Sequence, residues 1–156
     1  GLCGLRVADL GCGSGILGLA ALLLGAGSVA AVDIDSLAAR ATEENAAACG
    51  LRDRLRVRRG SVEVLAEVLV GRPADLLLCN ILAPVFEAVC PAFDTVLAPT
   101  GVGLLSGLLV RQEPRLRWAL AAEGWTDIAT ASQGDWGLLT IRRAGTDAGR
   151  APADVA

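Results

Sequence analysis

Short apolar runs alternate with longer stretches of helical character along most of the chain. Five of the short runs are predicted strands, at 5–10, 28–33, 55–59, 74–79 and 102–106. Five of the longer stretches are predicted helices, at about 14–24, 36–49, 61–70, 84–97 and 110–123. Because strands that alternate with helices need right-handed crossovers, this pattern predicts a parallel sheet.

The C-terminal third completes the predicted fold. Pro99-Thr100-Gly101 is expected to turn into the fifth strand, and strands at 125–131 and 136–142 form a hairpin across Ser-Gln-Gly-Asp. We therefore expect an α/β fold, a Rossmann-like, doubly wound and mostly parallel seven-stranded sheet with a C-terminal antiparallel hairpin. One domain should span 1–143, followed by a disordered tail at 144–156 that is rich in Ala, Gly, Asp and Pro.

Composition excludes several kinds of chemistry. The 14 basic residues are all Arg, and 17 acidic residues bring the net charge to −3, which argues against a protein that coats nucleic-acid phosphates. His, Tyr and Lys are absent, which excludes imidazole bases, Ser-His or Cys-His nucleophile pairs and Schiff-base lysines. Met is also absent, and the first residues already belong to a strand, so the true N-terminus is expected upstream.

The cysteines and the apolar stretches bear on the cellular compartment. Five cysteines show no C-x-x-C spacing, and no signal peptide is evident, so we expect reduced, mostly buried thiols, no metal site and a cytoplasmic protein. Residues 10–32 carry no charge, but six glycines interrupt them, and the helical part is too short to span a bilayer. No membrane association is expected.

The third strand lies in the run Arg52, Arg54, Arg56, Arg58 and Arg59. One interpretation is a patch for an acidic partner. The other is an edge strand whose charged side chains prevent pairing with another molecule, and we favour it.

Four groups should meet where the parallel strands end. They are the strand-one acid with its glycine turn, the strand-two acid, a serine after strand three and an amide after strand four: Asp9 with Gly11, Gly13 and Gly15; Asp33; Ser61; and Asn80. Asp33 follows Gly13 by 20 residues, the spacing of a ribose-binding carboxylate, although it could instead cap a helix. Asp9 could be only a polar residue at the end of a strand, and Asn80 could form hydrogen bonds that stabilise its own turn.

At these residues the chain resembles the class I S-adenosylmethionine-dependent methyltransferases, and more specifically the catalytic domain of the PrmA family of ribosomal protein L11 methyltransferases. The segments that carry the resemblance are Asp9-Leu-Gly-Cys-Gly-Ser-Gly-Ile-Leu17, Val32-Asp-Ile-Asp35, Glu44-Asn45, Gly60-Ser61, Asn80-Ile-Leu-Ala83, Leu105-Ser-Gly-Leu-Leu109 and Gly134-Asp-Trp136. The first is generic, whereas Asn-Ile-Leu-Ala, Leu-Ser-Gly-Leu-Leu and Gly-Asp-Trp together are fairly specific.

The resemblance implies a role for each residue toward S-adenosylmethionine. Gly11 and Gly13 with their neighbours would hold the methionine portion, Asp33 the ribose, Ile34 a face of the adenine, Ser61 and Val62 its edge, and Asn80 the reacting centre. Two departures matter. Many relatives have an acid where Ser61 stands, and the family's N-terminal substrate-recognition domain and Gly-Thr-Gly segment are absent.

The implied activity is methylation of protein amino groups, of a lysine side chain or an N-terminal amine, with ribosomal protein L11 as the expected substrate and no direct nucleic-acid binding. Methyl transfer to a neutral amine depends mainly on positioning, which suits a chain without His, Tyr or Lys. Two alternatives stay open. Gly13 to Gly18 also fits the G-x-G-x-x-G motif of NAD-type oxidoreductases, and the chain could bind its cofactor but be inactive without its N-terminal region.

Overall fold

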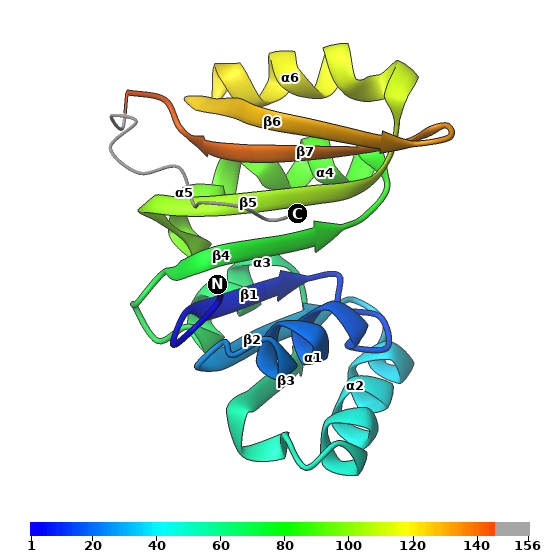
Figure 1. Cartoon of the computed structure of the whole chain (residues 1–156), viewed down its shortest axis with the longest axis vertical. Helices are drawn as coiled ribbons and strands as arrows, with labels where there is room; N and C mark the ends of the chain where they lie inside the picture. Colours follow the sequence, from blue (N-terminus) through cyan, green and yellow to red (C-terminus); the bar gives the residue numbers. More distant parts are fainter. Residues whose placement is uncertain (146–156) are drawn as a thin grey trace.

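A computed structural model describes residues 1–145, so that most of the expected tail at 144–156 lies outside the described residues. Within residues 1–145 the chain forms a seven-stranded sheet of order β3-β2-β1-β4-β5-β7-β6 (Figure 1). The strands are β1 (Arg6–Leu10), β2 (Ser28–Asp33), β3 (Leu55–Arg59), β4 (Ala74–Asn80), β5 (Leu97–Leu109), β6 (Trp125–Gln133) and β7 (Trp136–Arg143). The α-helices are α1 (Ile16–Leu23), α2 (Ser36–Ala48), α3 (Val62–Val68), α4 (Ala83–Val89), α5 (Phe93–Val96) and α6 (Glu113–Ala122).

Strands β1 to β5 run parallel to one another, and β7 is antiparallel to both β5 and β6. The central strands β1 and β4 are buried on both faces, which explains why they read as continuous apolar runs. The predicted α/β fold, with its mostly parallel sheet and C-terminal hairpin, is confirmed.

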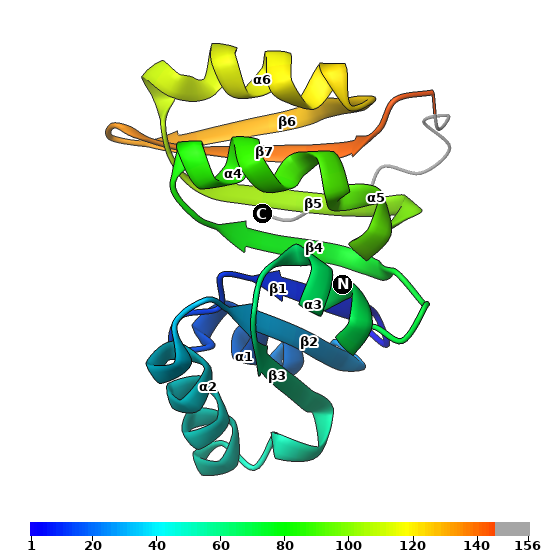
Figure 2. The same ribbon diagram turned by 180° about the vertical axis from the view of Figure 1, so that it is seen from behind.

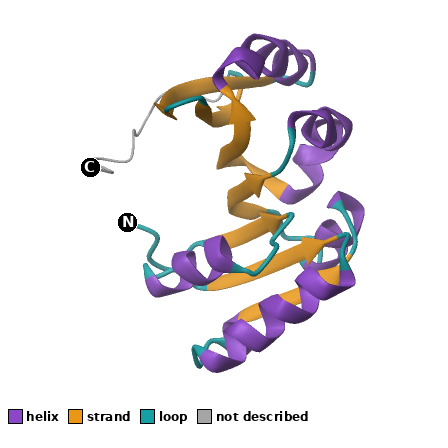
Figure 3. Cartoon of the chain, turned by 90° about the vertical axis from the view of Figure 1, so that its right-hand side faces the viewer, coloured by secondary structure: helices purple, strands orange, loops and turns teal. Residues whose placement is uncertain are grey.

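Helices cover the two faces of the sheet unequally. Helices α1 and α2 pack on one face over β1 to β3, and α3, α4, α5 and α6 lie on the other (Figures 1 to 3). Successive strand residues point to opposite faces, so Val7 belongs to the core beneath α1 whereas Ala8 belongs to the core beneath α3. Each face therefore has its own apolar core.

Two sequence-based predictions about the middle of the chain are wrong. The helix predicted at 84–97 is divided into α4, a 3₁₀ turn at Cys90–Ala92 and α5, because Pro91 has no N–H to continue the helical ladder. The expected turn at Pro99-Thr100-Gly101 lies inside β5. Pairing to β4 jumps from Leu97 to Val102 there, so these residues form an irregularity that tolerates a proline.

The uncharged stretch and the cysteines agree with expectation. Residues 10–32 divide into the end of β1, α1 and most of β2, and none of the helices in residues 1–145 has the length and apolar character to cross a membrane. All five cysteines are free thiols in the described part of the chain; Cys12, Cys79 and Cys90 are buried, and Cys3 and Cys49 are exposed.

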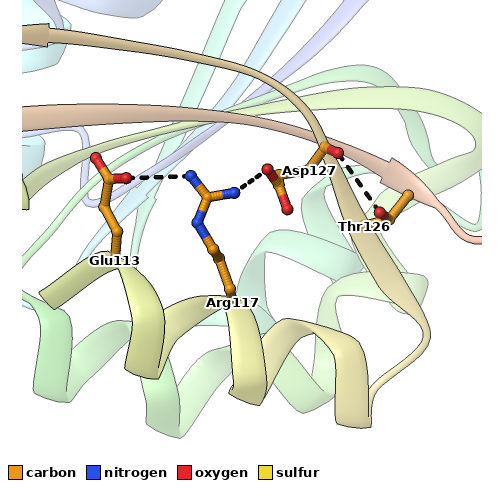
Figure 4. A network of polar contacts seen from close by, with 4 residues as sticks. All are labelled: Glu113, Arg117, Thr126 and Asp127. Carbon is orange, nitrogen blue, oxygen red and sulfur yellow. Dashed lines mark hydrogen bonds and ion pairs between the residues drawn. The ribbon is translucent and has the colours of Figure 1, made fainter.

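Besides the pairing of β7 with β5, the hairpin is held by contacts with α6 and the core. Arg117 on α6 forms ion pairs with Glu113 one turn earlier, at 3.1 Å, and with Asp127 on β6 (Figure 4). Beneath them Trp125 is only 2% exposed, with its ring centroid 6.4 Å from that of Phe93. These polar and apolar contacts thus hold the hairpin against α6 and the core on one face of the sheet.

The burial of Trp125 predicts a large effect of its removal. Trp125→Ala should lower the free energy of unfolding by about 3–5 kcal/mol, because both the apolar transfer energy and the packing around the cavity are lost. Urea denaturation followed by circular dichroism measures this. Trp118→Ala is the matched control, since Trp118 on α6 is 76% exposed and its loss should change the free energy by no more than about 0.5 kcal/mol. Equal effects of the two substitutions would contradict the packing described.

Candidate functional site

The carboxyl ends of the five parallel strands meet at one edge of the sheet, which therefore collects the residues that follow them. β1 ends before the glycine turn at Gly11, β2 ends at Asp33, and β4 ends at Asn80, which pairs with Ser106 of β5. The expectation that these groups share an edge is confirmed by the topology.

The glycine turn folds back over the end of β2. Gly11, Gly13 and Gly15 have φ values of 76°, 56° and 82°, a left-handed conformation that side chains rarely adopt. The N–H groups of Gly11 and Cys12 both donate to the carbonyl oxygen of Val32, at 2.9 and 3.0 Å. The turn thereby places the N-terminus of α1 beside Asp33.

The three glycines clear space for different neighbours. A Cβ added at Gly11 would lie 2.5 Å from Cγ2 of Ile81, and one at Gly15 would lie 2.8 Å from Cγ2 of Thr42. A Cβ at Gly13 would meet no atom within 4 Å. Gly11 and Gly15 therefore make room for side chains of this chain, and Gly13 is the glycine of the turn that faces open space.

Asp33 joins the glycine turn to the next loop. Its Oδ2 accepts the Gly13 N–H at 2.9 Å, and its Oδ1 accepts the Asp35 N–H at 3.0 Å. The side chain is partly exposed, and each oxygen keeps a further lone pair. The next residue, Ile34, has an apolar side chain that is 70% exposed, and its carbonyl oxygen accepts a hydrogen bond from Arg59 Nε.

Asp9 lies deeper than the other polar residues. It is 1% exposed, and Oδ2 accepts the N–H of Gly18 in α1 at 3.0 Å, whereas Oδ1 is buried and has no hydrogen-bond partner among residues 1–145. Burial, reinforced by the nearby charge of Asp33 and opposed by the Gly18 bond, raises the pKa of Asp9 to about 6. A Cβ at Gly18 would lie 3.0 Å from Oδ2, so this glycine serves helix packing.

Asn80 stands at the exposed end of β4, and the following Ile81 packs on the glycine turn. On the other side lies Gly107, with φ of 79°, where an added Cβ would lie 2.5 Å from Asn80 Oδ1 and 3.0 Å from the Ile81 carbonyl oxygen. The Asn80-Ile81 segment therefore lies between Gly11 and Gly107, with no side chain between it and either backbone.

Ser61 and Val62 begin α3 next to the end of β2. The N–H of Gly60 donates to the Asp33 carbonyl oxygen at 2.8 Å, and Ser61 occupies the N-cap position without a capping bond from its hydroxyl. The Val62 side chain is 2% exposed and packs in the core, so only its main chain can face a ligand at this edge.

Sequence reasoning assigned no role to three residues that support the site. Thr42 of α2 is fully buried and donates to the Gly13 carbonyl oxygen at 3.0 Å, and Asn45 donates to that of Ser14 at 2.9 Å. Gly107 is the third. A threonine on the same helical stripe as the buried Ala39 and Ala46 was the available signal for Thr42. Nothing in the sequence indicated which neighbour Gly107 would meet.

Comparison with known proteins agrees with this geometry. The family model described as "Ribosomal protein L11 methyltransferase (PrmA)" matches residues 3–144. Proteins named ribosomal protein L11 methyltransferase are similar in Synechococcus sp. (strain RCC307), 59% identical over 92% of this chain and 48% of its own, and in Parasynechococcus marenigrum (strain WH8102), 60% identical over 90% and 49%. The chain thus spans about half the length of these relatives.

A solved structure is similar throughout the fold. The crystal structure of a ribosomal protein L11 methylase from Lactobacillus delbrueckii subsp. bulgaricus superposes with a TM-score of 0.80 and 36% identity, over 90% of this chain and 70% of that one. The agreement of family model, relatives and structure means that the chain belongs to the PrmA family of ribosomal protein L11 methyltransferases.

Proposed function

We propose that this chain is the S-adenosylmethionine-binding and catalytic part of a protein N-methyltransferase that methylates amino groups of ribosomal protein L11 in the cytoplasm. The observation that carries the proposal is the position of the Asn80-Ile81 segment between Gly11 and Gly107, at the same edge of the sheet as the Asp33 carboxylate and the open backbone of Gly13. Family membership supports the same substrate class.

The residues present fit the parts of this cofactor. Asp33 has lone pairs left to accept the two ribose hydroxyls, and the exposed Ile34 side chain offers an apolar face to the adenine. Ser61 brings an uncommitted hydroxyl, and Val62 its main chain, to the adenine edge. The Gly13 backbone leaves room for the methionine portion, and the unpartnered Asp9 oxygen lies beneath that turn as a counter-charge for its ammonium group.

When bound, the cofactor supplies an electrophilic methyl group whose leaving group is a neutral thioether, so the protein needs no strong base. The chain must bind the acceptor amine in its neutral form and orient it, because an amine with a pKa of about 10.4 is mostly protonated at neutral pH. The Asn80 side-chain oxygen, with nearby main-chain carbonyls, accepts hydrogen bonds from the N–H groups of the neutral amine. These bonds orient its nitrogen lone pair toward the cofactor.

The rival cofactor is a nicotinamide dinucleotide, suggested by the spacing of Gly13 and Gly18. Gly18 is packed against Asp9 and Val29 inside the fold, but the third glycine of that motif also serves helix packing, so it does not separate the two cofactors. The absence of His, Tyr and Lys counts against the nicotinamide cofactor, because hydride transfer needs a proton donor. A buried carboxylate beneath the turn also disfavours the negative pyrophosphate and favours a cationic ligand.

Calorimetric titration separates the two cofactors. S-adenosylmethionine should bind and NAD should not, and Asp33→Asn should weaken S-adenosylmethionine binding by about tenfold or more, since a hydrogen bond to a charged group is lost. Asp35→Asn is the matched control, because that neighbouring carboxylate caps α2 through the Leu37 N–H. Binding of NAD in preference to S-adenosylmethionine would refute the assignment.

The raised pKa of Asp9 predicts a pH-dependent affinity. A cationic cofactor group favours the ionised carboxylate, so binding below the pKa of about 6 must release a proton, and affinity should rise about tenfold between pH 5 and pH 7. Isothermal titrations across this range measure how the affinity changes with pH. Asp9→Asn should abolish this pH dependence, and Asp35→Asn should leave it unchanged. An identical pH dependence in wild type and Asp9→Asn would show that another group titrates.

Removing the Asn80 amide tests the catalytic role. In the complete enzyme, Asn80→Ala should lower the rate of labelled methyl transfer to purified ribosomal protein L11 by about a hundredfold, the size expected for a lost hydrogen-bond acceptor at the reacting group. Its urea midpoint should equal that of the wild type because the side chain is exposed. Unchanged turnover would eliminate Asn80 as the group that aims the amine.

A further inference from the structure

Two adjoining grooves open at the opposite end of the sheet from the candidate site. Their volumes are about 450 and about 430 Å³, and they share Arg56, Val68 and Val70 in their walls. The second reaches Arg6 and Ser28, the first residues of β1 and β2. We call the pair the arginine groove, after the arginines that line it: Arg6, Arg52, Arg54, Arg56, Arg58 and Arg72.

The arginine groove carries positive charge that the described residues 1–145 do not neutralise. Three carboxylates line it, those of Glu43, Asp53 and Glu67, and Glu67 is paired with Arg58 at 2.8 Å. Arg52, Arg56 and Arg72 are exposed and form no ion pair within residues 1–145. Three guanidinium groups are therefore available to a ligand that carries negative charge.

Val70 adds an independent observation. Its φ of 53° makes it the one residue other than glycine with a positive φ in the described part of the chain, and its side chain is 71% exposed. A left-handed conformation costs an L-residue about 1–2 kcal/mol, and it is least suited to a β-branched side chain. Glycine or asparagine would relieve this strain, and a strained residue with an exposed apolar side chain is the kind of outlier that occurs at binding sites.

Protection of an edge strand explains only part of this arrangement. β3 does lie at the edge of the sheet, and Arg56 and Arg58 on it would hinder strand pairing with another molecule. Arg72 and Val70 lie beyond the end of α3 and Arg6 lies on an inner strand, where no edge needs protection. These arginines and Val70 line the same groove but lie on different elements, so protection of the edge strand does not account for all of them.

We propose that the arginine groove is a docking site for an acidic segment of a protein partner, with an apolar side chain of that segment resting on Val70. An apolar centre bordered by arginine is the composition of protein interfaces. No aromatic side chain lines the groove, whereas single-stranded nucleic acids bind by stacking bases on aromatic rings. Because the groove is at the other end of the sheet, the segment and the proposed cofactor can bind together.

A fluorescence anisotropy titration of the chain tests the proposal. The probe is a labelled twelve-residue peptide of glutamates with two central leucines, compared with an all-glutamate peptide and with a twelve-nucleotide oligouridylate. The mixed peptide should bind more tightly than either, and more weakly as salt rises. Arg56→Glu and Arg72→Glu should each weaken its binding by about tenfold. Val70→Asn should weaken it by about fivefold while raising the urea midpoint, because the strain is relieved.

Arg111→Glu is the matched control, because Arg111 is exposed and lies after β5 at the opposite end of the sheet, and it should leave peptide binding unchanged. Three results would overturn the proposal. They are no binding of the mixed peptide, equal weakening by Arg111→Glu and Arg56→Glu, or tighter binding of oligouridylate that Val70→Asn does not affect. Competition between the peptide and S-adenosylmethionine would also overturn it, because the two sites would then be one.

Discussion

The structure depends on the close approach of three backbones at the carboxyl edge of the sheet. Ile81 packs against Gly11, and Asn80 packs against Gly107, at distances that leave no room for a Cβ on either glycine. Both glycines have positive φ, so the same positions that lack side chains also turn the chain out of β1 and bend it within β5. The position of Asn80 and the shape of the glycine turn are thus set together, because each packs on the other.

The electrostatics of this edge suit a reaction that needs positioning more than proton transfer. Two carboxylates flank the glycine turn, and burial keeps the more deeply buried one, Asp9, partly protonated at slightly acidic pH. Cys12 in the same turn would compete for an electrophilic methyl group if it were a thiolate. Burial, together with the charges of Asp9 and Asp33, outweighs its bond with Thr42 and raises its pKa to about 11, so the thiol stays neutral.

The two ends of the sheet have opposite character. The carboxyl ends of β1 and β2 carry carboxylates and a turn of open backbone, which suit a cationic cofactor with hydroxyl groups. The other end carries unneutralised arginines around an exposed, strained valine. A net charge of −3 for the whole chain conceals this separation, because the positive charge is concentrated near β3. In the two proposals made above, docking and chemistry use different surfaces of the chain.

The order of apolar runs, glycines and strand-end acids was enough to determine the α/β fold, the parallel sheet and the edge where Asp33 and Asn80 lie, because these follow from local periodicity and from the geometry of parallel strands. Only the tertiary structure decided which neighbour each glycine makes room for, that Thr42 supports the turn from α2, and that Arg6 and Arg72 join the arginines of β3 in one groove. The physical reason is that these contacts join residues far apart in sequence, and the sequence pattern alone does not show which residues lie close together in space.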